Sequence, residues 1–540
     1  MKRFAFIMLW LTINQVLAQV WVRRYDGPAN GTDEATAIAV DASGNVYVTG
    51  FSYGGPSTLD DYATIKYNSS GDIIWLRRYN GGPDYSPEEA KAIAVDNSGN
   101  VYVTGSSVDT ISCDYTTIKY NSSGQEVWVR EYNGPGNDHD EADAIAVDNS
   151  GNVYVTGWSV GSGTDKDYAT IKYNTSGNIV WVKRYNGSGN SGDYARAIAV
   201  DANGYIYVTG ESVGSGTSSD YVTIKYNSFG DEMWVKRYNG PSNQNDCARA
   251  IAVDASGNVY VTGFSYGSGT SYDYATIKYN SFGDTVWVRR YNGPGNGIDE
   301  AWAIAVDNNG NVYVTGLSVG SNNNYGYATV KYNSSGQEVW VKRYDGPSDD
   351  EANAITVDNS GNVYVTGEAW FSGTNYDYFT IKYNSDGNII WSARYMGEGG
   401  SGDDKAKAIA VDASGNVYVT GYSWGSGTGY DYTTIKYSPV GVEEGSELRV
   451  ESLKLNVYPN PSAGYVNIIY HLPLKSNISL RIYDLFGRLV KTFNKESDEG
   501  THTIIWDGKD DNGKKVREGI YFYYFVTENL SSTGKLAIIK

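Results

Sequence analysis

The sequence is built from eight copies of one unit. The string Tyr-Val-Thr-Gly occurs eight times, and successive copies lie 51 to 55 residues apart. A period of this length is typical of solenoids, propellers and other arrays in which neighbouring units bury a continuous core. The length of 540 residues would otherwise suggest three or four domains. The repeat replaces that estimate with one array, which we place at residues 19–437.

Each copy contains four strand-like segments. In the copy that starts at Asp246 they are 248–253, 259–264, 273–279 and 285–291, with turns of Gly, Asn, Asp and Ser between them. Alternating patterns and many β-branched and aromatic residues favour strands. The first segment is rich in Ala, but it is short and runs directly into a turn, which argues against a helix. Four antiparallel strands in every repeat predict a β-propeller.

The first and fourth strands differ in the size of their side chains. We expect Ala248, Ala250 and Ala252 on one face of a thin strand near the axis, where the blades converge. The fourth strand carries a tryptophan in every copy, and we expect these rings to fill the widening space between blades. These residues are Trp21, Trp75, Trp128, Trp181, Trp234, Trp287, Trp340 and Trp391.

The order of the strands predicts how the ring closes. The array begins with a lone fourth strand, Val20 to Tyr25, and ends with a third strand, Thr433 to Tyr437, that has no fourth strand after it. The N-terminal strand can therefore complete the last blade and leave no open sheet edge. We predict an all-β fold with eight four-stranded blades.

The repeats carry the residues of a known family. The segments Ala250 to Gly263 and Asp273 to Asn280 read Ala-Ile-Ala-Val-Asp-x-x-Gly-Asn-Val-Tyr-Val-Thr-Gly and Asp-Tyr-Ala-Thr-Ile-Lys-Tyr-Asn. This pattern resembles the bacterial SBBP β-propeller repeat, whose name implies seven blades where this chain supplies eight. The resemblance implies a secreted or surface-exposed propeller. It supplies no ligand and no reaction.

The N-terminus and the net charge bear on location. Residues 1–18 read as a signal peptide, with Lys2 and Arg3 before an apolar run and a small-residue site at Ala18, and the alternative is a buried strand. The apolar run is shorter than the roughly 20 residues that cross a bilayer, and no later segment is long and apolar enough. The net charge of −19 disfavours nucleic acid and anionic membrane as partners. The two cysteines, Cys113 and Cys247, lie in different repeats, and we expect them to be free.

The pattern changes after the array. Residues 438–455 read as a linker, and short strand-like runs over residues 456–540 predict a small β-sandwich. The motifs of this part are Tyr458-Pro-Asn-Pro461, Ile482 to Arg488, Trp506-Asp-Gly508, Gly519 to Phe522 and Lys535 to Lys540. They resemble the type IX secretion C-terminal sorting domain and also the Ig-like domain of flagellar hook-capping proteins. The first resemblance implies export to the outer cell surface with the secretion machinery as partner, and the alternative is an Ig-like accessory module.

Positions that differ between copies are where function can enter. The turns between strands one and two are nearly uniform, and those between strands three and four are equally short. The connections from strand two to three, and from strand four to the next strand one, vary in length and composition. Variable loops on a rigid scaffold are the usual place for binding. We therefore expect any site on the face that carries these connections.

Three sets of residues are expected on this face. An acid precedes strand one in every copy and could form a collar that holds cations such as calcium, the alternative being hydrogen bonding within its own loop: Asp33, Glu88, Asp140, Asp193, Asp246, Asp299, Asp350 and Asp404. The residue after the first Ala of strand one varies: Thr36, Lys91, Asp143, Arg196, Arg249, Trp302, Asn353 and Lys407. Aromatic residues follow the repeated Gly or lie close to it, with packing between blades as the alternative role: Phe51, Trp158, Phe264, Trp370, Tyr422 and Trp424.

No catalytic constellation stands out. The three histidines, His139, His471 and His502, are scattered, and no nucleophile elbow with suitable partners is found. The leading hypothesis is a monomeric secreted or surface propeller of a bacterium that binds an extracellular glycan, peptide or protein and needs no resident cofactor. A glycan-active hydrolase or lyase that uses collar carboxylates, and a structural or adhesive surface protein, are the alternatives.

Overall fold

The computed structural model describes residues 19–56, 58–81, 87–108, 112–400, 402–438, 455–462, 464–472, 476–485, 488–498, 500–526 and 531–539. These ranges contain strands and turns and no α-helix, and therefore no helix able to span a membrane. The chain forms two compact units, Met1–Val442 and Glu443–Lys540. The signal peptide predicted at residues 1–18 and most of the linker predicted at 438–455 lie outside the described residues.

The first unit consists of eight four-stranded antiparallel sheets, the blades. Blade 1 contains β2 (Asp33–Val40), β3 (Val46–Gly55), β4 (Leu59–Tyr67) and β5 (Ile73–Tyr79). The next six blades repeat this order: β6 (Glu88–Val95), β7 (Val101–Val108), β8 (Cys113–Tyr120), β9 (Glu126–Tyr132); β10 (Asp140–Val147), β11 (Val153–Val160), β12 (Lys166–Tyr173), β13 (Ile179–Tyr185); β14 (Asp193–Val200), β15 (Ile206–Val213), β16 (Ser219–Tyr226), β17 (Glu232–Tyr238); β18 (Asp246–Val253), β19 (Val259–Tyr266), β20 (Tyr272–Tyr279), β21 (Thr285–Tyr291); β22 (Asp299–Val306), β23 (Val312–Val319), β24 (Tyr325–Tyr332), β25 (Glu338–Tyr344); β26 (Asp350–Val357), β27 (Val363–Phe371), β28 (Asn375–Tyr383), β29 (Ile389–Tyr395).

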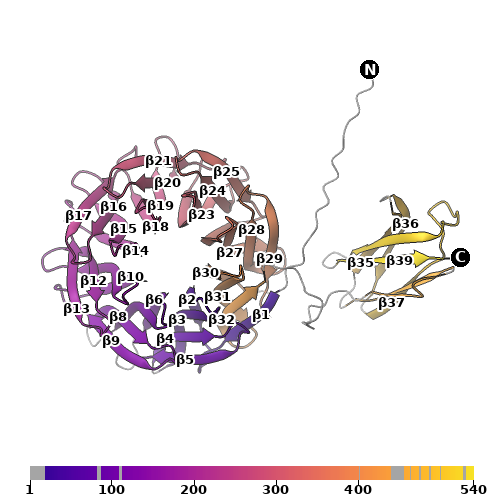
Figure 1. Cartoon of the computed structure of the whole chain (residues 1–540), viewed down its shortest axis with the longest axis horizontal. Coiled ribbons are helices and arrows are strands. Elements are labelled where there is room, and N and C mark those ends of the chain that lie inside the picture. Colours follow the sequence, from indigo (N-terminus) through magenta and orange to yellow (C-terminus); the bar gives the residue numbers. More distant parts are fainter. Residues whose placement is uncertain are drawn as a thin grey trace, which may run out of the picture. The chain divides into compact units, whose positions relative to one another are not determined.

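The two ends of the array share the last blade. Blade 8 contains β30 (Asp404–Val411), β31 (Val417–Gly425) and β32 (Gly429–Tyr437), and its outer strand is β1 (Gln19–Tyr25), which pairs antiparallel with β32. The ring of blades is closed, with first strands such as β6 and β14 toward the centre and fourth strands such as β9 and β17 at the rim (Figure 1). The prediction of an eight-bladed propeller completed by the N-terminal strand is confirmed.

Neighbouring blades are joined by a tryptophan wedge. Trp287 of blade 5 lies between Tyr260 of its own blade and Tyr332 of blade 6, with ring centroids 6.2 and 5.9 Å away. Its Nε1 donates a hydrogen bond to the Ser334 carbonyl at 3.4 Å, and Lys278 Nζ donates to the same oxygen at 3.1 Å. Trp287 is only 5% exposed. The expectation that the fourth-strand tryptophans fill the space between blades therefore holds here.

The first strand of each blade contains a β-bulge. In blade 5, Ala248 pairs with Gly263 and Ala250 pairs with Thr262, so that Arg249 is an extra residue. Gly263 and Thr262 are consecutive in β19 and face opposite sides of the sheet, so Ala248 and Ala250 do not share a face. Ala248 is fully buried whereas Ala250 and Ala252 are partly exposed. The expectation of one common face is therefore wrong for Ala248.

The bulge explains the invariant glycine of the Tyr-Val-Thr-Gly string. A Cβ on Gly263 would lie 2.0 Å from the Cys247 carbonyl oxygen and 3.0 Å from Ala248 Cα, both of which are backbone atoms. Every blade shows the same register shift between the two alanines that flank the extra residue. The glycine is therefore needed because strand one crosses close to it, and each blade has one extra residue at the same place.

The second unit is a β-sandwich, as predicted. One sheet contains β33 (Asn456–Tyr458), β34 (Val466–Leu472) and β37 (Gly500–Trp506), and the other contains β36 (Leu489–Ser497), β35 (Ser476–Tyr483), β38 (Gly519–Val526) and β39 (Ser531–Ile538). One core joins both sheets and includes the buried residues Ile468, Leu480, Trp506 and Phe525.

Replacing Trp287 by Ala should lower the free energy of unfolding of the propeller by about 3–5 kcal/mol, because the indole is buried between two blades. Chemical denaturation of the full chain measures this change. Val286, the preceding residue, is 51% exposed, so Val286→Ala serves as the control and should change stability by less than about 0.5 kcal/mol. Equal effects of the two substitutions would contradict the wedge assignment.

Replacing Gly263 by Ala should open the bulge of blade 5, since the added methyl meets backbone that cannot rotate away. We expect a fall of the thermal midpoint by several degrees, measured by circular dichroism. Thr285→Ala, on the exposed end of β21 in the same blade, is the control. An unchanged midpoint for Gly263→Ala would show that the bulge does not require glycine.

Candidate functional site

The acids that precede strand one anchor loops. Asp299 is fully buried, and its carboxylate accepts hydrogen bonds from the backbone N–H of Gly293 at 2.7 Å and of Val319 at 3.1 Å. One bond reaches the loop that enters strand one and the other reaches the end of strand two. The seven other acids are also at most 2% exposed and accept at least the equivalent bond from the entering loop.

Burial changes the acidity of these groups. It raises the pKa of Asp33 and of Asp350 to about 6, although backbone hydrogen bonds act in the opposite direction. The pKa of Asp299 is also raised by burial. Because these carboxylates are buried and already hydrogen-bonded, they do not form an open acidic collar. The alternative role, hydrogen bonding within the loops, accounts for Asp33, Glu88, Asp140, Asp193, Asp246, Asp299, Asp350 and Asp404.

Three carboxylates converge at the junction where the ring closes. Oxygens of Asp26, Asp33 and Asp431 lie within 4.8 Å of one another, and Asp431 is paired with Arg24 at 2.6 Å. An acidic cluster of this kind does not by itself define a cation site. Calcium binding therefore stays a prediction.

The extra residues of the bulges meet at one mouth of the central channel. Thr36, Trp302, Asn353 and Lys407 come from blades 1, 6, 7 and 8, yet they line one cavity of about 380 Å³. Glu34, Ala35, Phe51 and Glu89 complete its wall. The structure therefore brings the variable residues of strand one together with Phe51, one of the aromatic candidates.

One side of this mouth is filled by ion pairs. Lys91 contacts both Glu141 and Asp143, Arg196 lies 3.3 Å from Asp143, and Arg196 lies 2.9 Å from Glu211. These residues come from blades 2, 3 and 4. Burial raises the pKa of Asp143 even though Lys91 and Arg196 favour its charged form. The basic residues here are matched by acids, which leaves little free charge for a ligand.

The other side carries a stack of rings and a guanidinium. The Cζ of Arg249 lies 5.3 Å from the Phe264 ring centre and 5.1 Å from the Trp302 ring centre. Within the described part of the propeller, Arg249 Nε and Trp302 Nε1 are buried atoms without a hydrogen-bond acceptor. By contrast, Trp287 and six other fourth-strand tryptophans donate their Nε1 to a carbonyl. Trp302 therefore borders the cavity with an unused donor.

The remaining aromatic candidates contact residues of their own loops and strands and do not line the cavity. Trp158 is 8% exposed, and Lys166 Nζ lies 3.9 Å from the centre of its ring. Tyr422 stacks edge-on with Tyr430, and Lys407 Nζ lies 5.5 Å from its ring centre. Trp370 donates its backbone N–H to Asp350. Trp424 is 38% exposed and also stacks on Tyr430, so it belongs to the loop region of blade 8 and not to the cavity wall.

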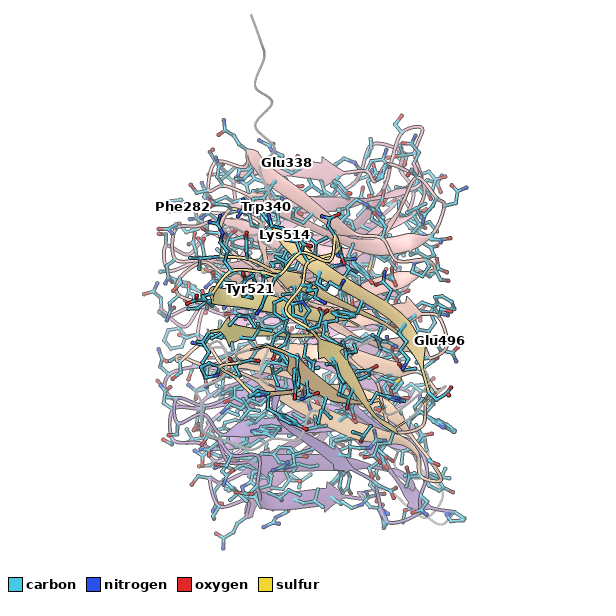
Figure 2. The ribbon with its side chains drawn as sticks, turned by 90° about the vertical axis from the view of Figure 1, so that its right-hand side faces the viewer. Phe282, Glu338, Trp340, Glu496, Lys514 and Tyr521 are labelled. Carbon is cyan, nitrogen blue, oxygen red and sulfur yellow. The ribbon has the colours of Figure 1, made fainter. Side chains whose placement is uncertain are left out.

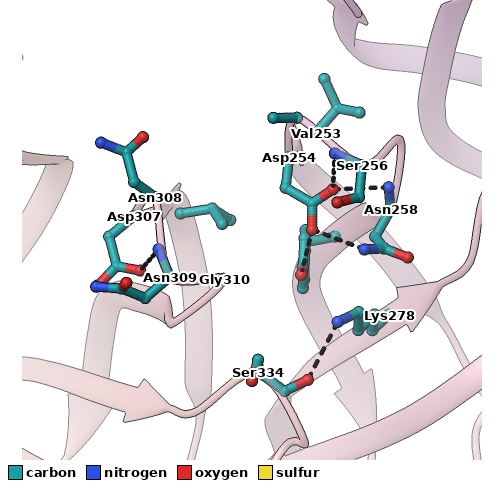
Figure 3. A pocket seen from close by; sticks show the side chains of 13 residues that line it. Val253, Asp254, Ser256, Asn258, Lys278, Asp307, Asn308, Asn309, Gly310 and Ser334 are labelled. Carbon is teal, nitrogen blue, oxygen red and sulfur yellow. Dashed lines mark hydrogen bonds between the residues drawn. The ribbon is translucent and has the colours of Figure 1, made fainter.

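A second cavity, of about 350 Å³, lies on the opposite face between blades 5 and 6 (Figure 3). Asp254 accepts hydrogen bonds there from the backbone N–H groups of Ser256 and Asn258 and from the Tyr260 hydroxyl. Lys278 donates to the Ser334 carbonyl, as drawn in Figure 3. The equivalent bonds recur in other blades, for example at Asp41 and Asp358. The hydrogen bonds that line this cavity therefore belong to the repeated scaffold.

The turns between strands three and four differ at one position. Phe229 and Phe282 occupy corresponding turns of blades 4 and 5, and each is 80% exposed. Figure 2 labels Phe282 at the edge of the propeller. Serine or aspartate stands at this place in the other described turns.

Comparison with known proteins agrees with the repeat pattern. The β-propeller repeat family SBBP matches residues 20–56, 74–108, 127–163, 180–216, 286–323, 339–373 and 390–427, and the secretion system C-terminal sorting domain matches residues 456–540. The chain carries SBBP propeller repeats and a type IX sorting domain. The copy between the fourth and fifth matches forms blade 5, with the same four strands. The sorting domain marks a secreted or cell-surface bacterial protein.

More distant similarities concern single proteins. An uncharacterised WD repeat-containing protein of Acanthamoeba polyphaga mimivirus is 22% identical over 463 residues, covering 68% of this chain and 31% of that protein. The chain thus spans about a third of the length of this curated relative. PorZ, a surface component of the type IX secretion system of Porphyromonas gingivalis, aligns at 16% identity with a TM-score of 0.39, covering 96% of this chain and 70% of PorZ. The polysaccharide lyase Uly1 aligns at 12% identity with a TM-score of 0.39, covering 75% of this chain and 89% of the lyase.

Stability should fall as the pH rises from about 4 to 7. An aspartate with a pKa of about 6 in the folded state and about 3.9 in the unfolded chain binds more protons when folded, so its contribution to stability is lost as it ionises. Thermal midpoints measured between pH 4.5 and 7.5 test this, and Asp350→Asn should flatten the slope. A midpoint that rises with pH over this range would contradict the assignment.

Proposed function

We propose that the propeller is a binding module, and that its ligand, a glycan, peptide or protein, occupies the mouth of the central channel on the face of the variable loops. The supporting observation is the set of extra residues in the bulges. Six residue types occupy these eight positions, although the strands around them are nearly constant. Several of these side chains line one cavity that draws on five blades. Variation of this kind gives one asymmetric site on a symmetric ring.

The loops beside the cavity are held in place before any ligand binds. Each buried acid ties the loop that enters strand one, and in most blades it also ties the end of strand two. A site whose surroundings are already ordered loses less conformational freedom on binding. The rigidity of this face therefore favours binding over a purely space-filling role.

The sorting domain completes the proposal. It would direct the propeller through the type IX machinery to the outside of the cell, where the channel mouth meets extracellular molecules. A hydrolase or lyase that relies on the collar carboxylates is less well supported, because these groups are buried and engaged in loop hydrogen bonds. The alternative of a structural or adhesive protein predicts assembly or cell attachment without a soluble ligand.

The full chain should bind a restricted set of probes on combined glycan and peptide arrays, run with and without calcium. Trp302→Thr, which installs the residue that blade 1 carries at this position, should remove that binding and leave the fold intact. Asn308→Ala, on the opposite face, installs the residue found in blade 5 and is the control.

Flat arrays with folded protein would overturn the proposal, as would binding that survives Trp302→Thr. Release of new reducing ends from an arrayed glycan would move the assignment from a binding module to an enzyme.

A further inference from the structure

The cavity at the channel mouth contains both kinds of unused polar group. Trp302 Nε1 lacks an acceptor. Among the described residues, no hydrogen bond or ion pair reaches Lys407 Nζ or the carboxylates of Glu34 and Glu89, which all border the cavity. A ligand that satisfies this wall must accept hydrogen bonds from two donors and also donate hydrogen bonds to two carboxylates.

The charges of the cavity disfavour a strongly charged ligand. Glu34 and Glu89 would repel an anion, while Lys407 and the nearby guanidinium of Arg249 would repel a cation. Hydroxyl groups meet the requirement without a net charge, since each can donate one hydrogen bond and accept others. A molecule with several hydroxyls around a compact ring therefore suits this arrangement.

Trp302 provides a flat apolar surface that is fixed in place. The guanidinium of Arg249, from blade 5, lies over the indole on one side and also lies near the Phe264 ring. The other residues of the cavity wall come from blades 7, 8, 1 and 2, so Trp302 turns its remaining surface toward them. No other blade has an aromatic residue at this position, so the fold does not require one here.

We infer that the ligand is a neutral carbohydrate whose terminal sugar ring packs against Trp302, with its hydroxyls bonded to Glu34, Glu89, Lys407 and Trp302 Nε1. This inference rests on the proposed function and names the ligand class of the same site. The volume of about 380 Å³ lies in the lower part of the range of small-molecule sites, which fits one or two sugar units. The apolar face of a sugar ring packs on Trp302, and Phe51 adds a second apolar surface.

Calorimetric titration of the full chain with neutral hexasaccharides of glucose (α1,4 and β1,4), xylose, mannose and N-acetylglucosamine tests the inference. At least one should bind. Trp302→Thr should weaken that binding about tenfold or more, and Trp302→Phe, which keeps a ring but loses the N–H, should weaken it less. Glu34→Gln should also weaken it. Trp424→Phe, which alters an exposed ring of the same face outside the cavity, should leave it unchanged, and circular dichroism should show each variant folded.

The outcomes separate the ligand class from the site. Binding of a peptide or a charged glycan that Trp302→Thr removes would overturn the carbohydrate inference and keep the proposed binding site. Sugar binding that is insensitive to Trp302→Thr would overturn both the inference and the site. No binding of any neutral hexasaccharide would overturn the inference, and flat arrays in addition would overturn the proposed function.

Discussion

The structure depends on one recurring junction between blades. An outer-strand tryptophan packs between tyrosines of two blades and, at seven of the eight junctions, donates to a carbonyl of the next blade, while a strand-three lysine donates to that same carbonyl. The junction that closes the ring uses the same chemistry. Trp21 Nε1 and Lys436 Nζ both donate to the Ser69 carbonyl, at 3.2 and 2.9 Å, although these residues come from opposite ends of the array. Closure therefore needs no special interaction, because β1 supplies the missing outer strand.

The ion pairs within the blades tolerate local change where a neighbouring residue compensates. Arg290 of blade 5 pairs with Asp273 at 2.8 Å. In blade 6 the residue equivalent to Asp273 is Gly326, and Arg343 pairs instead with Asp345, two residues further along its own strand end, at 2.6 Å. Blade 6 therefore keeps an acidic partner for the arginine, although this acid stands at a different position of the repeat. This exchange indicates that the ion pair serves the scaffold, which makes it a poor guide to a ligand.

The bulge separates what the ring needs from what can vary. The glycine of strand two permits the close crossing, and the alanine on each side of the extra residue keeps its pairing. The extra residue is outside this pairing and faces the mouth of the channel. Its side chain can therefore change from threonine to arginine or tryptophan without disturbing the junctions between blades. Eight such positions around one axis yield a surface that no single repeat contains.

The blade count, the strand order and the closure by the N-terminal strand all follow from the sequence, because the period and the unpaired end strands allow one arrangement. The sequence also identified the variable positions, including Arg249 and Trp302. Tertiary structure decided what these residues do. The acids before strand one have the same sequence pattern whether they line a channel or anchor a loop. The structure shows that they anchor loops, because backbone N–H groups such as those of Gly293 and Val319 donate hydrogen bonds to them. The alternating pattern of strand one also does not predict the bulge, since the bulge depends on how closely this strand crosses a glycine of strand two. The cavity could not be predicted from the sequence, because its side chains come from five blades and meet only when the ring closes.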